Sequence, residues 1–380
     1  MSAPTADLAA LKEQVRALAT ELGFDAFGAT SLSAPLENSE KLTGWLDAGF
    51  HGTMSWMERN LALRLSPGDL FPGARAVLLF GEDSRRRPPA GSGQDEPRPA
   101  GRTAEAPAPS FRAARYAQGR DYHKRIHGRL RQVCALLARH GGMQRACVDT
   151  APVMEKLLAV RAGLGWQGRS TLLVHPRHGP WLLLGAVFTT LAIPPDTPLP
   201  NRCGTCRRCL DACPTGALDG EGALDARRCA AYLTIEHKGE IPEALRPRLG
   251  DRLFGCDSCL EACPWGGKPP GQPARVPPMQ ASPGTPAAPR ANPFGTLPPL
   301  HETLAWTEAD FAARFDGTPV RRLGLPGWLR NACVVLGNTG TPAAIPALRR
   351  LAGSAPPSAF LVPGHALWAI SRILARHTPG

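Results

Sequence analysis

The feature that most constrains this 380-residue chain is the concentration of eight of its 11 cysteines between Cys203 and Cys263. They form a four-cysteine run, a single cysteine and a three-cysteine run, namely Cys203-x2-Cys206-x2-Cys209-x3-Cys213-Pro214, Cys229, and Cys256-x2-Cys259-x3-Cys263-Pro264. In ferredoxin-type runs of this spacing, three thiolates bind three irons of one 4Fe-4S cluster, and the fourth binds the other cluster. The sequence therefore predicts a module that folds around two 4Fe-4S clusters.

If the last cysteine of each run crosses over to bind the cluster of the other run, every cysteine of the module can be assigned to one of the two clusters. Cluster one is expected to take Cys203, Cys206, Cys209 and Cys263, and cluster two Cys213, Cys256, Cys259 and, to complete four ligands, Cys229. The alternative is a pair of structural zinc sites. A structural zinc site is typically formed by two Cys-x2-Cys knuckles around one tetrahedral centre. It does not require the last cysteine of a Cys-x2-Cys-x2-Cys-x3-Cys-Pro run or the proline after it, so the pattern favours iron–sulfur clusters.

The same spacing separates the module from a disulfide scaffold and, in a reducing compartment, indicates metal binding. The other three cysteines, Cys134, Cys147 and Cys333, lie in apolar stretches and are expected to be small buried hydrophobic residues.

The charge and hydropathy of the chain point to a polyanionic partner and away from a membrane. Lys and Arg outnumber Asp and Glu by 44 to 32, an excess that suits a partner such as RNA. The longest apolar run, from Trp181 to Ile193, is shorter than the roughly 20 residues that a helix needs to cross a bilayer. The first residues include Asp7 and Glu13 and carry no twin-arginine pair, so we expect a cytoplasmic location.

Hydrophobic periodicity predicts an α+β fold of several units. We expect a catalytic α+β domain over residues 1–198 with a Pro-rich insertion at 85–110, a ferredoxin-like module over 199–268, a Pro-rich linker over 269–303, and a helical domain over 304–380. Within the first, a helix is expected from Val153 to Ala162, and a β-hairpin from Ser170–His175 and Trp181–Thr190. The helical domain looks like a pair of degenerate HEAT-type repeats, too few to bury a core without docking on the rest of the chain.

Several long motifs outside the cysteine module resemble those of epoxyqueuosine reductases. The first two read Val148-Asp149-Thr150-Ala151-Pro152-Val153-Met154-Glu155-Lys156 and Ala162-Gly163-Leu164-Gly165-Trp166-Gln167-Gly168-Arg169. The others are Tyr116-Ala117-x-Gly119-x-Asp121-Tyr122-His123, Leu224 to Cys229, Tyr232 to Glu236, and Cys263-Pro264-Trp265. The similarity extends from about residue 8 to residue 375, apart from the two Pro-rich inserts.

The resemblance implies an enzyme with a cobalamin in a nitroreductase-like N-terminal domain, fed by the two clusters. It implies reduction of epoxyqueuosine to queuosine in tRNAs with a GUN anticodon, the last step of queuosine synthesis, with Asp149 as proton donor. The implied cobalamin contacts are Arg64, Tyr116, Asp121, Tyr122, His123, Asp149, the segment from Leu173 to Leu184, and Ala231, where the family often has serine. The implied tRNA contacts are Lys156, His237 and Lys238.

The chemistry of such a reaction agrees with this set of groups. Converting an epoxide to an alkene and water takes two electrons and two protons, whereas clusters deliver electrons singly. A reducible cobalt centre is therefore a suitable final acceptor of these electrons before the substrate. A carboxylic acid beside it can protonate the leaving oxygen if a dry pocket raises its pKa towards neutrality. Asp121-x-His123 begins a cobalt-ligating Asp-x-His-x2-Gly motif, but Ile126 replaces the glycine, which predicts a base-off cobalamin without a histidine ligand.

Other interpretations of these residues stay open at the level of the sequence. Asp149 precedes a predicted helix and could cap it, Lys156 could be a solvated surface residue, and Tyr116, Tyr122 and His123 could be core-edge residues. The chain as a whole could be a corrinoid reductive dehalogenase-like enzyme, which normally carries a twin-arginine signal, or a non-catalytic iron–sulfur electron-transfer protein. The enzyme interpretation also requires an electron donor, which could be a reductase, a ferredoxin or a flavodoxin. We expect the protein to be a monomer.

Overall fold

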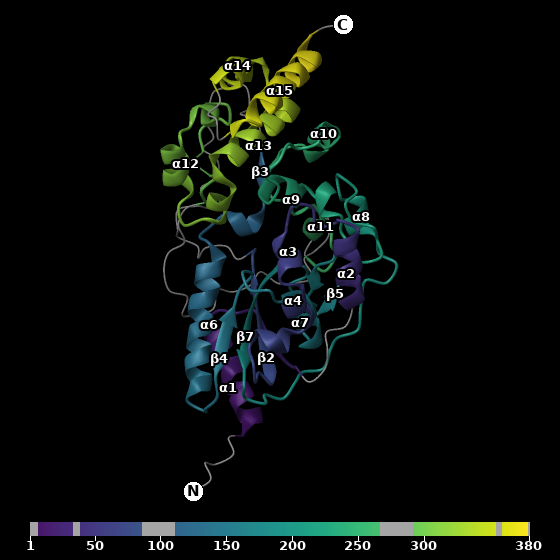
Figure 1. The fold of residues 1–380 in the computed structure, drawn as a ribbon, viewed down its shortest axis with the longest axis vertical. Helices are drawn as coiled ribbons and strands as arrows, with labels where there is room; N and C mark the ends of the chain where they lie inside the picture. The colour runs from purple at the N-terminus through teal and green to yellow at the C-terminus, as the bar shows by residue number, and fades with distance from the viewer. Residues whose placement is uncertain are drawn as a thin grey trace, which may run out of the picture.

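The computed structural model describes residues 7–32, 39–85, 111–266, 292–295, 297–354 and 359–378. The N-terminus and the C-terminus lie at opposite ends of the long axis (Figure 1). The sheet and its helices occupy the lower part of this view, the helices α12 to α15 the upper part, and the short helices of the cysteine module the right side between them. The Pro-rich insertion expected at 85–110 and most of the linker expected at 269–303 lie outside the described residues.

The helices and strands divide along the chain into an N-terminal part, the cysteine module and a C-terminal part. The N-terminal part contains α1 (Leu8–Glu21), β1 (Ala26–Ser31), α2 (Ser39–Asp47), α3 (Trp56–Arg59), α4 (Leu61–Leu65), α5 (Pro67–Leu70), β2 (Ala76–Asp83), β3 (Arg112–Ala113), α6 (Tyr122–Ala138), β4 (Gln144–Cys147), α7 (Glu155–Arg161), β5 (Trp166–Gln167), β6 (Leu173–Val174) and β7 (Leu182–Thr189). The cysteine module contains α8 (Arg208–Asp211), α9 (Ala230–Ile235), α10 (Arg246–Leu249), β8 (Arg252–Phe254) and α11 (Ser258–Glu261). The C-terminal part contains α12 (Glu308–Phe315), the 3-10 helix η5 (Pro319–Leu323), α13 (Gly324–Thr339), α14 (Ile345–Ser354) and α15 (Val362–His377).

The N-terminal part is built on a four-stranded antiparallel sheet with the strand order β1-β2-β7-β4. All eight residues of β2 are buried, which is expected of a central strand covered on both faces. On one face, Leu78 and Phe80 pack with the apolar sides of α1 and α6. On the other face, Val77 and Leu79 pack with α7. The result is a three-layer arrangement in which α7 lies on the opposite face of the sheet from α1 and α6.

Two details of the sequence-based expectation are wrong. The segments 170–175 and 181–190 do not form a hairpin with each other, because β7 uses both of its edges to pair with β2 and β4, while β6 pairs with β5. An isolated bridge between His175 and Gly179 closes the turn that lies between the two segments. The helix expected to start at Val153 starts at Glu155, since residues 148–154 form an irregular loop in which Val153 N–H bonds to the Ala151 carbonyl.

The cysteine module is anchored to the sheet by the segment that follows Cys263. Trp265 packs edge-to-face on Trp166 of β5 with ring centroids 5.0 Å apart. The Gly266 carbonyl accepts a hydrogen bond from Trp181 Nε1 at 3.0 Å and another from the Arg85 guanidinium. Gly179 adopts φ +58°, and a Cβ atom there would lie 2.4 Å from Gly266 Cα, so this contact requires glycine. The cluster ligand Cys263 is therefore fixed relative to the catalytic domain.

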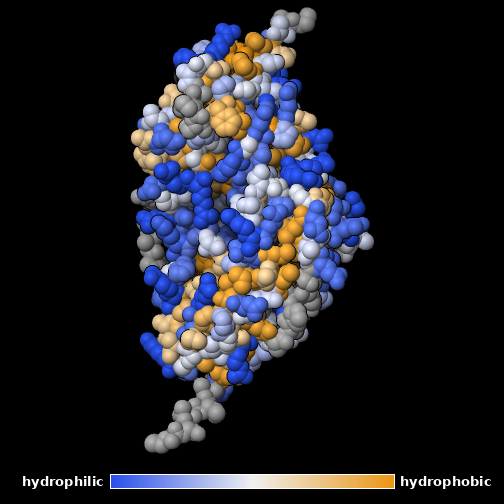
Figure 2. Space-filling view, in the orientation of Figure 1, coloured by the Kyte–Doolittle hydropathy of each residue, from blue (hydrophilic) through white to orange (hydrophobic). Residues whose placement is uncertain are grey.

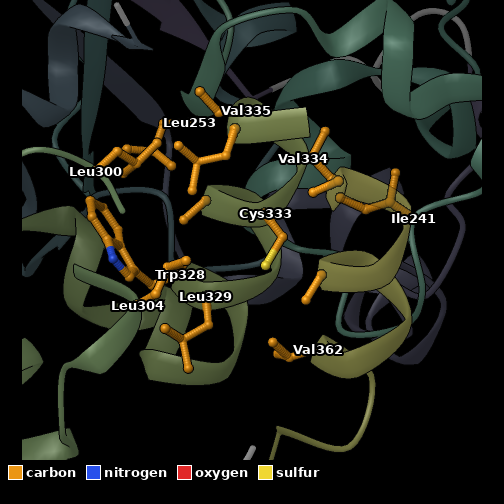
Figure 3. Packing of buried hydrophobic residues seen from close by; sticks show 14 of the residues in the cluster. Ile241, Leu253, Leu300, Leu304, Trp328, Leu329, Cys333, Val334, Val335 and Val362 are labelled. Atoms are coloured by element: carbon orange, nitrogen blue, oxygen red, sulfur yellow. The ribbon is translucent and has the colours of Figure 1, made fainter. Parts of the chain in front are cut away.

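The C-terminal helices form the largest hydrophobic cluster of the described residues together with parts of the cysteine module. Figure 3 shows Trp328, Leu329, Cys333, Val334 and Val335 of α13 packed with Leu253 and Ile241 of the module and with Val362 of α15. Cys333 is fully buried, Cys147 is buried and Cys134 is half-buried, which agrees with the expectation that these cysteines behave as small apolar residues. Leu300 and Thr303 are also buried in this region, so the packed C-terminal part begins before residue 304.

Polar side chains of α13 explain why the C-terminal helices dock on the module. Arg330 is buried and donates to the backbone carbonyls of His237, Gly239 and Leu233 at 2.6, 2.8 and 2.7 Å. Asn331 donates to the carbonyls of Thr234 and Leu253, and Asn338 donates to those of Arg246 and Gly250. These contacts confirm that the C-terminal helices pack against the rest of the chain.

Replacing Arg330 should therefore be costly. We expect Arg330→Ala to lower the free energy of unfolding by on the order of 3 kcal/mol, because three buried carbonyls lose their donor. Thermal unfolding of the cluster-loaded protein measures this, with the exposed Arg349→Ala of α14 as the matched control, expected to stay within about 0.5 kcal/mol of the parent. Equal stabilities of the two variants would contradict this docking role.

Among the described residues, no helix has both the length and the apolar character required to span a bilayer.

Candidate active site

Asp149 lies in the loop that joins β4 to α7, immediately beyond the sheet. It adopts φ +52°, a left-handed conformation that is uncommon for residues other than glycine but is tolerated best by Asp and Asn. Its carboxylate accepts a hydrogen bond from the Tyr122 hydroxyl and lies 3.2 Å from His123 Nε2. The N-cap of α7 is Met154, without a side-chain cap, so the structure gives no support to the helix-capping interpretation of Asp149.

A chain of hydrogen bonds orients the partners of Asp149. Asp121 caps α6 through the His123 amide and also contacts His123 Nδ1 at 2.6 Å. Because both ring nitrogens face carboxylates, the pKa of His123 is raised in spite of its burial. Tyr116 packs edge-to-face on Tyr122, which adds an aromatic wall beside the carboxylate. Four of the residues implied by the resemblance thus gather around Asp149.

The pKa of Asp149 differs from the sequence-based expectation. Burial alone would raise the pKa of this carboxyl, but hydrogen bonds from His123 and Tyr122 and the nearby charges of His123 and Lys156 outweigh burial and lower it. The pKa raised towards neutrality was expected of a dry pocket beneath a corrin, and in the protein alone the direction is the opposite.

Arg322, which no sequence motif indicates, reaches the same site from the C-terminal part of the chain. Its guanidinium lies 3.4 Å from His123 Nε2, and its charge opposes the rise in the pKa of His123. The contact is supported by a bond from the Asp121 N–H to the Gly317 carbonyl at 2.9 Å. The docking of the C-terminal part therefore completes the site with a cation.

Three buried polar atoms in the segments that carry the family-like motifs or in Arg64 have no hydrogen-bond partner among the described residues. Arg64 Nε, Glu155 Oε1 and Trp166 Nε1 are each buried and make no hydrogen bond within the described residues. Arg64 and Glu155 are electrostatically coupled, as are Glu155 and Asp149. Buried polar atoms normally have partners, so these three leave hydrogen-bonding capacity for a bound molecule. A large cofactor with amide side chains, such as a corrin, fits this set.

Lys156 is the residue that connects this pocket with the cysteine module. It is exposed to solvent, yet desolvation lowers its pKa, while the charges of Asp149, Glu155, Cys259 and Cys229 act in the opposite direction. The Lys156 ammonium is therefore near enough to the Asp149 carboxylate and to two thiols of the module to interact with both.

The remaining residues implied as cofactor contacts have different environments. The side chain of Leu173 is buried in the hydrophobic core beside α7, so only its backbone could reach a ligand. Leu184 is half-buried on β7, opposite Gly81 of β2. Ala231 lies on α9, two residues after Cys229, and is half-buried.

The two implied tRNA contacts on the module lie close together after α9. The ring of His237 packs on that of Tyr232 at 5.6 Å and its Nε2 lies 2.9 Å from the Glu240 carbonyl. Lys238 is exposed, and its ammonium donates to the carbonyls of Ile235 and Arg322. Lys238 and Arg322 therefore form a continuous basic edge next to His123.

Figure 2 shows hydrophilic side chains gathered across the middle of one face, between the lower sheet and the upper helices. Basic residues that are exposed in the segments forming this site are Arg115, Arg120, Lys124, Lys156, Lys238, Arg321 and Arg322.

The thiols of the module lie close enough to one another to interact electrostatically. The Cys263 thiol interacts with those of Cys203 and Cys209, and Cys209 with Cys206. The Cys259 thiol interacts with those of Cys256, Cys229 and Cys213 and also with that of Cys209, so the assignment of each thiol to one cluster stays a prediction. Among the described residues no three side chains converge on one metal ion, and a 4Fe-4S cluster does not require this, because each thiolate binds its own iron.

Cys213 differs from the other thiols of its group. It accepts hydrogen bonds from the Ala217 N–H at 3.3 Å and contacts the Thr215 hydroxyl at 3.7 Å. Burial would raise its pKa, but these bonds outweigh burial and lower it, whereas burial raises the pKa of Cys229. Hydrogen bonds to a ligand sulfur are a recognised means of tuning a cluster potential.

Comparison with protein-family models identifies both parts of this arrangement. The model described as "Epoxyqueuosine reductase QueG, DUF1730" matches residues 64–150, which include Arg64, the Tyr116 to His123 segment and Asp149. The model described as "4Fe-4S double cluster binding domain" matches residues 202–266, which include all eight clustered cysteines. The second match supports iron–sulfur clusters over the zinc alternative.

Curated relatives match over almost their whole length. The chain is 40% identical to the epoxyqueuosine reductase of Xanthomonas campestris pv. campestris, over 94% of this chain and 95% of the relative. It is 38% identical to that of Pseudomonas aeruginosa, over 96% and 95%, and 36% identical to that of Escherichia coli, over 99% and 93%.

Solved structures give the same result. A crystal structure of epoxyqueuosine reductase with an epoxyqueuosine-modified tRNA-Tyr stem loop is similar with a TM-score of 0.80 at 27% identity, over 97% of this chain and 91% of that chain. The Bacillus subtilis enzyme, in a structure whose catalytic aspartate loop is swung out of the active site, is similar to the same extent. Together with identities of 36 to 40% across nearly complete chains, this shows that the chain belongs to the epoxyqueuosine reductase family of oxidoreductases.

Proposed function

We propose that this protein reduces epoxyqueuosine to queuosine in tRNAs with a GUN anticodon, the last step of queuosine synthesis, using electrons that pass through two 4Fe-4S clusters. The observation that carries the proposal is the presence, on one chain, of a double-cluster cysteine module and of a carboxylate site that meet at Lys156. An electron-transfer protein would need the module alone. The Asp149 site, with Tyr122 and His123, supplies what a reductase needs in addition, namely a controlled source of protons.

The grouping of the thiols sets the direction of electron flow. Cluster two, bound by Cys213, Cys229, Cys256 and Cys259, is the one whose ligands interact with Lys156 and so lies nearer the pocket. Cluster one, bound by Cys203, Cys206, Cys209 and Cys263, lies behind it. Electrons from a ferredoxin, flavodoxin or reductase therefore enter at cluster one and leave from cluster two.

Cobalamin is the cofactor that best suits the unpaired polar atoms around Asp149. Arg64, Tyr116, Tyr122, the backbone from Leu173 to Leu184, and Ala231 would hold it, in a domain of nitroreductase-like fold. When bound, it supplies a reducible cobalt that can store the electrons that clusters deliver one at a time. Asp121 and Asp149 both engage His123, so this imidazole is occupied, which supports a cobalamin without His123 as a ligand.

Protonation of the leaving oxygen is assigned to Asp149. In the protein alone the pKa of His123 is raised and that of Asp149 is lowered by their mutual contact, and Tyr122 donates to the carboxylate. Excluding water from the pocket raises the pKa of a carboxyl group, so closure over the substrate moves the proton from His123 to Asp149. His123 and Asp121 hold the carboxylate in place and return its proton after each transfer.

The basic edge formed by Lys238 and Arg322, with Lys156 and His237, would bind the tRNA backbone. We therefore expect the dissociation constant for tRNA to rise steeply with salt, because each neutralised phosphate releases counterions. Measuring binding of an unmodified anticodon stem loop between low and high salt tests this, and Lys238→Ala should make the slope shallower. A slope near zero in the parent protein would contradict a phosphate-binding role for this edge.

The same proposal includes the domain boundaries predicted from the sequence and the HEAT-like character of residues 304–380. It also includes a monomeric state and a cytoplasmic location. The docking of α13 on the module through Arg330, Asn331 and Asn338 supports a C-terminal part that acts with the site and not as a separate binding module.

Complementation tests the proposed function in a cell. A bacterial strain that lacks its own epoxyqueuosine reductase accumulates the epoxide in its tRNA, and expression of this chain should restore queuosine in hydrolysed tRNA. Persistence of the epoxide in cells that contain the protein with its full iron content would contradict the proposal.

A further inference from the structure

Residues 202–208, which carry the first cysteines of the module and are called the arginine loop below, concentrate unpaired positive charge. Arg202, Arg207 and Arg208 are exposed, and within the part of the chain that the structure describes their side chains make no hydrogen bond or ion pair. By contrast, Arg227, exposed elsewhere on the module, pairs with Asp225 at 2.9 Å. Unpaired arginines that face solvent together form a positively charged surface that attracts an acidic partner.

The arginine loop is held in shape by contacts with the catalytic domain. Asn201 Nδ2 donates to the Gln167 carbonyl at 3.1 Å, and Asn201 Oδ1 accepts the Cys203 N–H at 2.9 Å. Arg169 donates to the Gly204 carbonyl at 3.1 Å. A Cβ atom added to Gly204 would meet no atom of the described residues within 4 Å, so the outer side of this turn is uncovered. A preorganised and uncovered loop binds a partner without the cost of first being ordered.

The position of the arginine loop decides which kind of acidic partner it fits. The loop contains thiols predicted to bind cluster one, where the proposed function has electrons enter. Helix α8, which begins at Arg208, lies at the right of the view, whereas α6, whose first residue contacts Asp149, lies at the left (Figure 1). A molecule on the loop therefore lies beside a cluster and leaves the proton-donating site open to the substrate. Electron-transfer complexes are small and rely on complementary charge for rapid association.

We propose that the arginine loop is the docking surface for an acidic protein that carries single electrons, such as a flavodoxin. This rests on the proposed function, since it identifies the class of partner that supplies its electrons. In each encounter one electron leaves the reduced carrier and enters one cluster, and no covalent bond forms or breaks. Arg207 and Arg208 attract the carrier to the loop, so they act on association and not on the chemistry at Asp149.

Charge reversal in the arginine loop tests this proposal. Arg207→Glu/Arg208→Glu reverses two of the three charges, and Arg207→Gln/Arg208→Gln removes the same two charges with less risk to the fold. Arg349→Glu/Arg350→Glu is the matched control, because it makes the same change of charge at exposed positions of α14, at the top of Figure 1. All variants are studied as full-length, cluster-loaded protein, and each is expected to keep the iron content of the parent. If the Glu variant loses iron, the Gln variant decides.

The first measurement is the dissociation constant for oxidised flavodoxin at low salt, which requires no turnover. We expect this constant to rise about tenfold in Arg207→Glu/Arg208→Glu, to rise less in the Gln variant, and to stay within about twofold of the parent in the control. The second measurement is the rate at which reduced flavodoxin reduces the clusters. This rate should fall about tenfold in the Glu variant, and in the parent it should fall as salt is added. Reduced methyl viologen, a small cation, should reduce the clusters of the Glu variant no more slowly than those of the parent.

Parent-like affinity and rate in both loop variants would overturn the proposal. An equal loss in the α14 control would also overturn it, since only the net charge would then matter. Weaker binding of a tRNA stem loop by the Glu variant, with an unchanged flavodoxin rate, would show that the loop binds RNA and not an electron carrier. Parent clusters that methyl viologen cannot reduce would refute the electron route of the proposed function, whereas normal reduction by methyl viologen with an unaltered flavodoxin rate in the variants refutes the docking surface alone.

Discussion

Asp149→Asn should lower the turnover of epoxyqueuosine by about 10²–10⁴-fold, the usual contribution of a positioned general acid. The amide is isosteric and can still accept a hydrogen bond from Tyr122, but it cannot receive a proton from His123 and pass it on. The substitution changes one atom of a side chain and leaves the loop backbone unaltered, so the fold should be retained. Single-turnover assays with nucleoside analysis measure the effect.

The variant must keep its cofactors for this result to have meaning. Iron content and cobalamin binding of Asp149→Asn should equal those of the parent, and Asp69→Asn, at an exposed position of α5, should leave turnover unchanged. Turnover of Asp149→Asn within a few-fold of the parent would show that another group protonates the leaving oxygen.

Cys213→Ala should abolish turnover and remove about half of the iron. Cys213 follows the first three cysteines of its run, but the crossover of ferredoxin-type runs assigns it to cluster two with Cys229, Cys256 and Cys259. Its loss would leave cluster two with three thiolates, while cluster one keeps all four, so bound iron should fall from about eight to about four atoms per chain. Because we propose that cluster two lies between cluster one and the pocket, the remaining iron should not support the reaction.

The matched control is Cys134→Ala on α6, which removes a half-buried thiol outside the module and should keep all the iron. Loss of iron from both variants to the same extent would show a general fragility of the protein. Retention of about eight irons by Cys213→Ala would show that the crossover assignment is wrong.

Local patterns predicted much of this molecule. The spacing of the cysteines predicts a double-cluster module, which the match to a 4Fe-4S double cluster binding domain supports. Apolar residues recur at helical spacing from Leu8 to Leu22 and from Ile126 to Leu137, and α1 and α6 each bury this face on the sheet. The resemblance placed Asp149 beside Tyr122 and His123, and the structure brings these residues into contact.

The features that sequence reasoning missed depend on contacts between distant segments. Arg322 reaches His123 from 199 residues away, and no local pattern marks it among the basic residues around it. The expected hairpin failed because both edges of β7 are taken by strands remote in sequence, a choice that alternation of residue types does not encode. The direction of the pKa of Asp149 depends on the balance between burial and two hydrogen bonds, which only coordinates provide.

The most direct measurement is nucleoside mass spectrometry of epoxyqueuosine-containing tRNA after incubation with the anaerobic protein, loaded with iron, sulfide and cobalamin and supplied with a one-electron reductant. The account predicts that the epoxyqueuosine signal is replaced by queuosine, one oxygen lighter, and that conversion stops without the reductant or with Asp149→Asn. Unchanged epoxyqueuosine in the presence of both clusters and bound cobalamin would contradict it.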